Sequence, residues 1–453
     1  MKKIIFIIAV AYLTGCGIYK PYQQPDVRTA GLFGTEYETT DSSTIANVSW
    51  REIFTDPELQ VLIEYGIENN TNLQIAHWRV RQAEAALSTS RLAFLPSLHL
   101  APEGSLSSFD GATPTKVYSV PVVASWEIDV FGKLQNAKKR SKAAYLQSHE
   151  YVQAVRTQLI ATIANYYYTL LMLDAQYEIS VRTAASWYES VEVMRAMKEA
   201  GMTNEAGVAQ IEASYFAIEA SVRDLYQQIT EMENNLSILL GEAPQEIQRG
   251  TLAGQYFPVQ LAVGVPLQLL TNRPDVKSAE LTLVQAHYAT NEARASLYPS
   301  ITLAGSAGWT NSAGGYIVNP GKLLWSAAAS LTQPLFNKGI HRAQVKIAEA
   351  QRQEAMLNFQ QTLLNAGAEV NNALTQYQVA REKQQFRIQQ ITSLETAVES
   401  TELLMNHGSI TYLDILTARQ SLLSAQLNQV ADKFSEIQSV VNLYHALGGG
   451  RDN

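Results

Sequence analysis

Apolar side chains recur with a helical period in two separate stretches of the chain. From Leu73 to Leu87, and again from Val276 to Leu297, they fall largely at alternating three- and four-residue steps, the pattern of a coiled-coil seam. Alanine fills many of these positions, so helix backbones can approach closely and each helix can pack on two neighbours. Both stretches end at a proline, Pro96 or Pro299, beyond which a helix does not readily continue.

Beyond each proline the apolar period changes to two, which predicts β-strands. Tyr118, Val120 and Val122 begin one alternating run, and Ile301 begins another. We expect one hairpin in each half of the chain, with strands near 97–108 and 116–129 and near 300–311 and 322–335. The apolar faces and the aromatic residues near the strand ends are typical of outer-membrane strands, although an amphipathic hairpin on a water-exposed domain has the same pattern.

A long polar stretch rich in Ala, Gln and Glu follows each hairpin, at about 133–200 and about 337–406, and contains no proline. At a rise of 1.5 Å per residue, each stretch predicts a helix that reaches roughly 100 Å. Gly201 and Gly408 then resemble C-terminal caps, and a second helix returns to Gly241 or Gly448. The predicted order of elements in each half is therefore helix, hairpin, long helix, turn and helix.

The shared order indicates an internal duplication. Residues 90–98 match 293–301 at an offset of 203, Phe131-Gly132-Lys133 matches Phe336-Asn337-Lys338 at 205, and Gly201 matches Gly408 at 207. The expected divisions after a signal peptide over 1–15 are a lipid-anchored segment over 16–58 that begins an equatorial belt, a first repeat over 59–241, an equatorial linker over 242–270, a second repeat over 271–448 and a tail over 449–453.

The predicted strands require several copies of the chain. Four strands cannot close a barrel, because the smallest outer-membrane barrels have about eight strands and open edges are not tolerated in lipid. Three copies supply about twelve strands and leave room for a channel, whereas side chains would mostly fill a barrel made by two copies. The expected fold is mainly α and internally duplicated, with a long α-helical barrel and a transmembrane β-barrel that several copies of the chain share.

The first residues have the features of an export signal. Lys2 and Lys3 precede an apolar run from Ile4 to Leu13, which is too short to span a membrane. Leu13-Thr14-Gly15-Cys16 resembles a lipobox, and Cys16 is the only cysteine in 453 residues. We therefore expect removal of residues 1–15 and a covalent lipid on Cys16, which would hold the chain to outer-membrane lipids. A chance cysteine in a signal peptide is the alternative.

Charge and motifs argue against several other classes of protein. A net charge of -8 without a dense Lys/Arg patch argues against a nucleic-acid partner. The seven histidines are scattered, without a metal-ligand or nucleophile motif, so we expect no catalytic residue, no metal site and no cofactor besides the lipid. Tyr166-Tyr167-Tyr168 predicts aromatic packing rather than ligand stacking. Four methionines near the two turns predict adaptable packing, with soft-metal handling as the alternative: Met194, Met197, Met202 and Met405.

Three motifs resemble those of the outer membrane efflux proteins, the TolC-like outer membrane factors, and especially their lipidated branch. They are the Trp/Phe/Asp-Pro/Leu pattern over 50–59, the strand-to-helix junction over 126–133, and Arg273-Pro274-Asp275-Val276 at the opening of the second repeat. The resemblance covers nearly the whole chain. It implies a homotrimer in the bacterial outer membrane with a large periplasmic portion, which passively conducts substrates from an inner-membrane pump and a periplasmic adaptor to the exterior.

The resemblance also implies a periplasmic gate. Members of the family often carry acidic residues that ring the aperture just after the second-repeat turn, where this chain has Asp414. Three symmetry-related carboxylates near one axis would attract cations and repel one another. Thr417 replaces the second acid of some members, and Gly207 is the equivalent residue of the first repeat. A solvated helix carboxylate is the alternative.

A structural periplasmic coiled-coil lipoprotein, or an adaptor without channel activity, is the other function considered. An adaptor would lack two equivalent amphipathic hairpins and would carry a lipoyl-like β domain, for which the sequence has no candidate. No enzyme activity is expected. The transported substrate depends on partner proteins and is not readable from this chain.

Overall fold

The computed structural model describes residues 19–25, 49–257, 273–311, 321–406 and 412–449. The chain divides into two compact units. Unit 1 comprises Met1–Arg28, Trp78–Glu150 and Lys277–Thr362, and unit 2 comprises Thr29–His77, Tyr151–Val276 and Leu363–Asn453. Several long helices contribute one part to each unit, and the two units are described separately.

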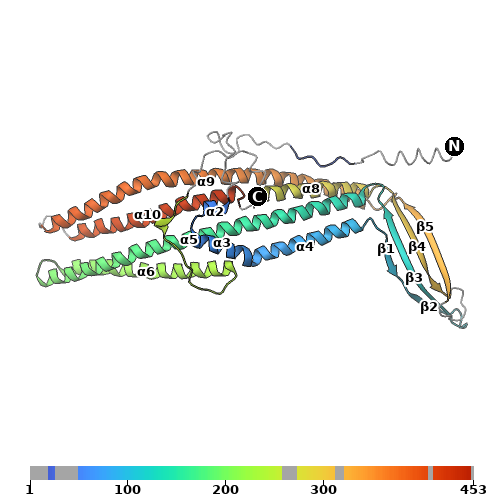
Figure 1. Ribbon diagram of the computed structural model, residues 1–453, viewed down its shortest axis with the longest axis horizontal. Helices are drawn as coiled ribbons and strands as arrows, with labels where there is room; N and C mark the ends of the chain where they lie inside the picture. Colours follow the sequence, from blue (N-terminus) through green and yellow to red (C-terminus); the bar gives the residue numbers. More distant parts are fainter. Residues whose placement is uncertain (1–18, 26–48, 258–272, 312–320, 407–411, 450–453) are drawn as a thin grey trace. The chain divides into compact units, whose positions relative to one another are not determined.

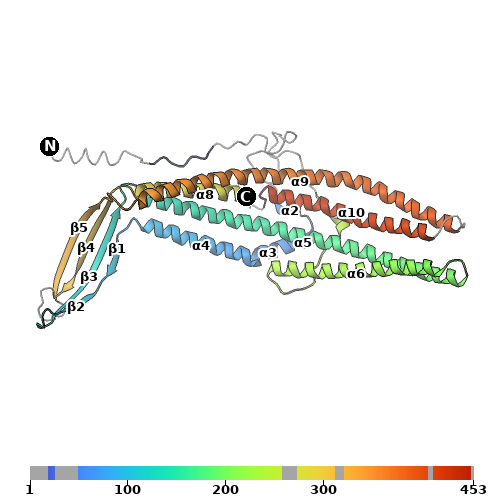
Figure 2. The same ribbon diagram turned by 180° about the vertical axis from the view of Figure 1, so that it is seen from behind.

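Helices account for most of the described residues (Figures 1 and 2). The first repeat has α3 (Pro57–Asn69), α4 (Thr71–Leu92), α5 (Lys133–Glu199) and α6 (Glu205–Leu240), preceded by the short α2 (Trp50–Ile53). The second has α8 (Pro274–Ala295), α9 (Ile340–Asn406) and α10 (Tyr412–Ala446), and a 3-10 turn, η2 (Leu252–Gly254), lies in between. Helices α5 and α9 have 67 residues each, which corresponds to about 100 Å of helix.

Helix ends follow local capping chemistry. The Asp129 carboxylate accepts the backbone N–H groups of Leu134 and Gln135, at 3.0 and 2.7 Å, and so defines the start of α5. Helix α9 begins at Ile340 rather than near 337 as expected, because Lys338 and Gly339 both have positive φ angles that a helix cannot contain. Gly201 and Gly241 adopt left-handed conformations after α5 and α6. Gly408 lies outside the described residues.

Unit 1 contains one antiparallel sheet. Its order is β1 (Ser97–Leu100), β3 (Thr115–Ile128), β4 (Ser300–Thr310) and β5 (Lys322–Thr332), and β2 (Glu103–Ser107) pairs with the other end of β3. The single strand expected over 97–108 is therefore broken, because Pro102 has no N–H to continue the ladder. Pairing of β3 with β4, from Ser119↔Thr310 to Ile128↔Ile301, joins the two repeats into one sheet.

A glycine makes the β3–β4 pairing possible. A Cβ atom at Gly308 would lie 2.3 Å from the Cα of Pro121 and 2.3 Å from the Val120 carbonyl oxygen. Both neighbours are backbone atoms of β3, so a side chain could be accommodated only if the strands separated. This close approach of the two backbones explains why β4 has a glycine at position 308.

Large apolar side chains form the main core of unit 2. Trp50, Phe54 and Leu59 are at most 1% exposed, so the Trp/Phe/Asp-Pro/Leu pattern over 50–59 is a packing motif. The Phe54 ring meets Tyr444 of α10 edge to face, with ring centroids 5.5 Å apart. Tyr167 and Tyr168 are also fully buried here, as expected for aromatic packing.

Equivalent contacts of the two repeats make the duplication visible within unit 2. The Asn70 amide donates to the Leu239 carbonyl at 2.8 Å, and the Arg273 guanidinium donates to the Ala446 carbonyl at 2.6 Å. The donors are 203 residues apart and the acceptors 207, which are the offsets of the sequence repeat. In each repeat, the residue directly before α4 or α8 therefore caps the C-terminal end of the returning helix, α6 or α10.

No helix among the described residues is both long enough and apolar enough to cross a membrane. Several strongly exposed aliphatic and aromatic side chains of unit 1 lie in and beside the sheet: Leu323 (66%), Trp325 (73%), Leu331 (68%), Leu335 (93%) and Phe336 (88%).

Candidate functional site

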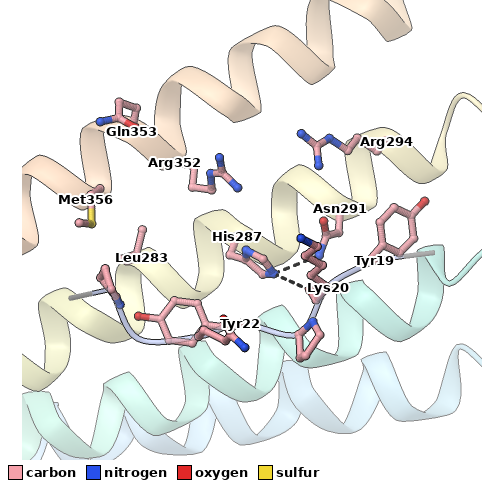
Figure 3. Close-up of a pocket in the computed structure, with 13 residues that line it drawn as sticks. Tyr19, Lys20, Tyr22, Leu283, His287, Asn291, Arg294, Arg352, Gln353 and Met356 are labelled. Carbon is pink, nitrogen blue, oxygen red and sulfur yellow. Dashed lines mark hydrogen bonds between the residues drawn. The ribbon is translucent and has the colours of Figure 1, made fainter. Parts of the chain in front are cut away.

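The segment Tyr19–Pro25 packs on the helices of unit 1 (Figure 3). The Lys20 carbonyl accepts a hydrogen bond from His287 Nε2 at 3.1 Å, and the Tyr22 hydroxyl donates to Glu280 at 3.4 Å. The segment borders a cavity of about 640 Å³, to which α9 contributes Arg352, Gln353 and Met356. Cys16, the expected lipidation site, lies outside the described residues, three positions before Tyr19.

Burial controls the ionisation of this site. It lowers the pKa of His287, and the positive charges of Arg352, Arg294 and Lys139 act in the same direction against the hydrogen bond from the ring to Lys20. Burial also raises the pKa of Glu280, despite the hydrogen bond from Tyr22. At neutral pH His287 is therefore uncharged, and the segment is held by hydrogen bonds and ring contacts.

The two returning helices begin differently at the far ends of α5 and α9 within unit 2. Asp414 is the third residue of α10 and is exposed, while Leu416, two residues further, is buried. Gly207 is the third residue of α6, where a Cβ atom would lie 3.0 Å from Met194 Cε and Thr203 Oγ1. At the position equivalent to Asp414, the first repeat therefore has a glycine in close contact with the Met194 and Thr203 side chains, and a larger residue would require these side chains to shift.

The four methionines near the turns line one cavity of about 930 Å³. Met194 is 1% exposed and belongs to an apolar cluster shared by α5, α6 and α10, whereas Met202 is 72% exposed. This supports the packing interpretation for Met194. No group of three or more His, Cys, Asp or Glu side chains suited to a metal ion occurs within the described part of the chain.

An arginine joins the two repeats next to this cluster. Arg419 of α10 donates to the Ser190 hydroxyl of α5 at 2.7 Å and to Glu402 of α9 at 2.6 Å. Ser190 also donates to the Ser186 carbonyl, so its hydroxyl has a second partner. No sequence pattern indicates this link, because residues 229 positions apart give no local signal.

A second polar network holds the connection that follows α6. Arg249 contacts both carboxylate oxygens of Asp174, at 2.5 and 3.0 Å, and also Glu233 at 2.5 Å. Burial opposes the charge of Arg249, but these two acidic partners more than offset it and raise its pKa. Next to it, the Tyr167 hydroxyl donates to Asp56 at 2.7 Å and accepts the Gly250 N–H at 3.0 Å.

Asp56 therefore has two roles. It is the N-cap of α3, as its place before Pro57 predicts, and its second oxygen accepts from Tyr167 and from Gln255. The network joins α3, α5 and the segment after α6 within unit 2. His287, the histidine of these sites, has no nucleophile or metal-ligand arrangement around it among the described residues.

Comparison with known proteins places these features in a family. Residues 62–242 and 265–449 match the family model described as outer membrane efflux protein. The chain is 28% identical over 455 residues to the cation efflux system protein CusC of Escherichia coli, covering 99% of this chain and 98% of CusC. It is 26% identical to the probable outer membrane lipoprotein SilC of Salmonella typhimurium, covering 99% of this chain and 98% of SilC.

A solved structure has the same fold. The crystal structure of CusC, studied for transmembrane channel formation, superposes with a TM-score of 0.88 at 26% identity and covers 96% of this chain and 100% of that one. The matched ranges include the sheet-bearing segments and both repeats, apart from the first residues of α3.

Proposed function

This chain belongs to the outer membrane efflux protein family, and we propose that it conducts substrates passively, with Cys16 as its lipid anchor and Asp414 at its periplasmic gate. Its general function is that of an outer-membrane efflux channel of a tripartite system. The expected fold class, a helical barrel and a β domain in a trimer, is confirmed.

One observation carries the proposal for this chain itself. Unit 1 has a sheet with four strand positions and large apolar side chains on its surface, and the described strands β1 and β5 each have a partner on one side only. Open strand edges cannot remain in lipid. Neighbouring copies that pair β5 with β1 would satisfy both edges and enclose a lumen, through which solutes diffuse without an energy source in this chain.

The packing of Tyr19–Pro25 supports lipidation of Cys16. This segment, which begins three residues after the cysteine, is held on the helices that adjoin the sheet. A lipid on Cys16 would therefore start from the sheet-bearing unit. Mass spectrometry of the purified protein tests this: a diacylglyceryl and acyl mass increment on Cys16 is expected, and a free thiol or an intact leader would overturn it.

Asp414 is the gate residue that we propose. It is exposed in the first turn of α10. Because the trimer brings three copies of this carboxylate around one axis, their negative charges would favour cations. The reversal potential across a KCl gradient tests this: Asp414→Asn should lower the cation preference, and Asp224→Asn, an exposed change within α6, should leave it unchanged. Equal selectivity of both variants and wild type would remove Asp414 from the gate.

The partners follow from the same family relationship. A periplasmic adaptor and an inner-membrane pump would supply the substrate and the energy, and their identities decide what is transported. Co-purification of the channel with a candidate adaptor would test a given pair. Substitutions in the turn between α5 and α6 should reduce this co-purification.

A structural lipoprotein without channel activity would leave the sheet without a role. It predicts a monomer that stays in water once residues 1–16 are removed. A trimer that resists heating in detergent is the result that the channel predicts.

A further inference from the structure

Two basic segments lie at the starts of α5 and α9 within unit 1. Lys133–Lys142 contains five Lys or Arg residues in ten, and Lys338–Lys346 contains three in nine, with no acidic residue in either. The first follows β3, which ends at Ile128, and the second follows β5, which ends at Thr332. The basic segments therefore occupy corresponding places in the two repeats, next to the helix-side end of the sheet (Figure 1).

Helix stability does not explain these cations. The N-terminus of a helix carries a partial positive charge, so each nearby cation costs about 0.3–1 kcal/mol and acidic residues are preferred there. The first turns of α5 and α9 contain no acidic residue, whereas those of α6 and α10 contain Glu205 and Asp414. Lys133 at the start of α5, and Lys338 and Arg342 at the start of α9, run against this preference. The Asp129 carboxylate caps α5, but no residue of either segment is acidic, so helix stability does not account for the cations.

Most of these side chains are exposed and lack an acidic partner. Lys133 pairs with Glu127 at 3.0 Å and Arg140 with Glu292 at 3.1 Å. Among the described residues no ion pair involves the exposed side chains of the remaining group: Lys138, Lys139, Lys142, Lys338, Arg342 and Lys346. Lys138 and Lys139 do lie over aromatic rings, those of Phe94 and Tyr288.

The charge of the whole chain conceals this concentration. Within unit 1, the segments Trp78–Glu150 and Lys277–Thr362 carry 16 basic and 10 acidic residues, whereas unit 2 carries 14 and 31. The expectation that the chain has no dense basic patch therefore does not hold for unit 1. A net positive unit in a protein of net charge -8 needs a specific explanation.

Apolar and aromatic side chains border the basic segments. Leu335 and Phe336, directly before the second segment, are 93% and 88% exposed. Trp126 and Tyr298, at the same end of the sheet, are 39% and 42% exposed. Aromatic and aliphatic side chains beside cations are typical of the boundary between hydrocarbon and lipid headgroups.

We infer that the basic segments bind the phosphodiester headgroups of anionic phospholipids in the periplasm-facing leaflet of the outer membrane. The helices of this family extend into the periplasm, so the helix-side end of the sheet faces that leaflet. This inference goes beyond the channel function and needs only the membrane location.

Native mass spectrometry of the detergent-purified full-length trimer tests the inference. The probes are phosphatidylglycerol and phosphatidylcholine with identical acyl chains. The test variant carries Lys142→Gln, Lys338→Gln, Arg342→Gln and Lys346→Gln. The control removes four exposed cations from unit 2 with Arg182→Gln, Lys198→Gln, Arg223→Gln and Arg381→Gln.

Wild type and control should retain phosphatidylglycerol in preference to phosphatidylcholine. In the test variant, the ratio of bound phosphatidylglycerol to bound phosphatidylcholine should fall at least about tenfold, because each cation near an anionic surface contributes about 1 kcal/mol. Raising the salt concentration should weaken the wild-type preference in the same way. An unchanged lipid preference in the test variant overturns the inference. If adaptor binding is lost instead, the basic segments bind protein; if only ion selectivity changes, they face the lumen.

Discussion

Replacement of Arg249 by methionine tests how the connection after α6 is held. The Arg249 and Glu233 side chains are 14% and 13% exposed, while Asp174 is 37% exposed. Removing one partner of a buried ion pair costs about 3–5 kcal/mol, whereas an exposed pair contributes about 0–1 kcal/mol. Glu233 keeps a backbone donor, the Ile247 N–H at 3.5 Å. We therefore expect the local free energy of unfolding to fall by about 3 kcal/mol, the lower end of the range for a buried pair.

Hydrogen exchange read by mass spectrometry measures this loss directly. A local opening free energy lower by about 3 kcal/mol corresponds to exchange roughly 150-fold faster in peptides covering residues 245–257. Arg223→Met is the matched control, because Arg223 is 77% exposed and lies 3.8 Å from Glu219. Adding Glu233→Leu to Arg249→Met should recover part of the protection by removing the stranded carboxylate. Unchanged exchange in the single variant would refute the reasoning.

Three further predictions concern the sheet, the N-terminal segment and the helix turns. Gly308→Ala should abolish the heat-resistant trimer on gels, since its Cβ would lie 2.3 Å from backbone atoms of β3, and Gly104→Ala, which meets nothing within 4 Å, should not. Because burial lowers the pKa of His287 below 6.5, the neutral ring stabilises the fold fully above pH 6.5 and this stabilisation is lost as the pH falls below it. His287→Gln should therefore reduce the drop in melting temperature between pH 7.5 and 5.5; an identical drop in both proteins contradicts this. Arg419→Met should raise the single-channel open probability by up to about fivefold, which corresponds to about 1 kcal/mol for a partly exposed ion pair and hydrogen bond; an unchanged open probability would show that this link does not control gating.

Periodicity predicts the elements of this fold because it reports which face of each element is buried. The change from a helical period to alternation at Pro96 and Pro299 corresponds to the change from α4 to β1 and from α8 to β4. The break between β1 and β2 is a local effect of Pro102, which alternation does not register.

The polar networks could not be predicted from periodicity or motifs. Arg249 and Asp174 are 75 residues apart, and Arg419 and Ser190 are 229 apart. Such pairs depend on how helices from different parts of the chain pack, and neither residue type is unusual on a helix. The pattern over 50–59 was visible, but its role as the core of unit 2 required Tyr167, Tyr168 and Tyr444 to be placed beside it.

The basic segments illustrate a different limit. Their residues are plain in the sequence, but the whole-chain charge of -8 suggested no concentration of cations. Only the assignment of residues to two units separated a basic part from an acidic one.

Single-channel recording of the purified, detergent-extracted protein in planar bilayers tests the central claim most directly. The account predicts stable, low-conductance, cation-preferring openings from a trimer, without any added nucleotide. A protein that is trimeric and folded by circular dichroism but gives no conductance under any applied voltage or salt condition would contradict it.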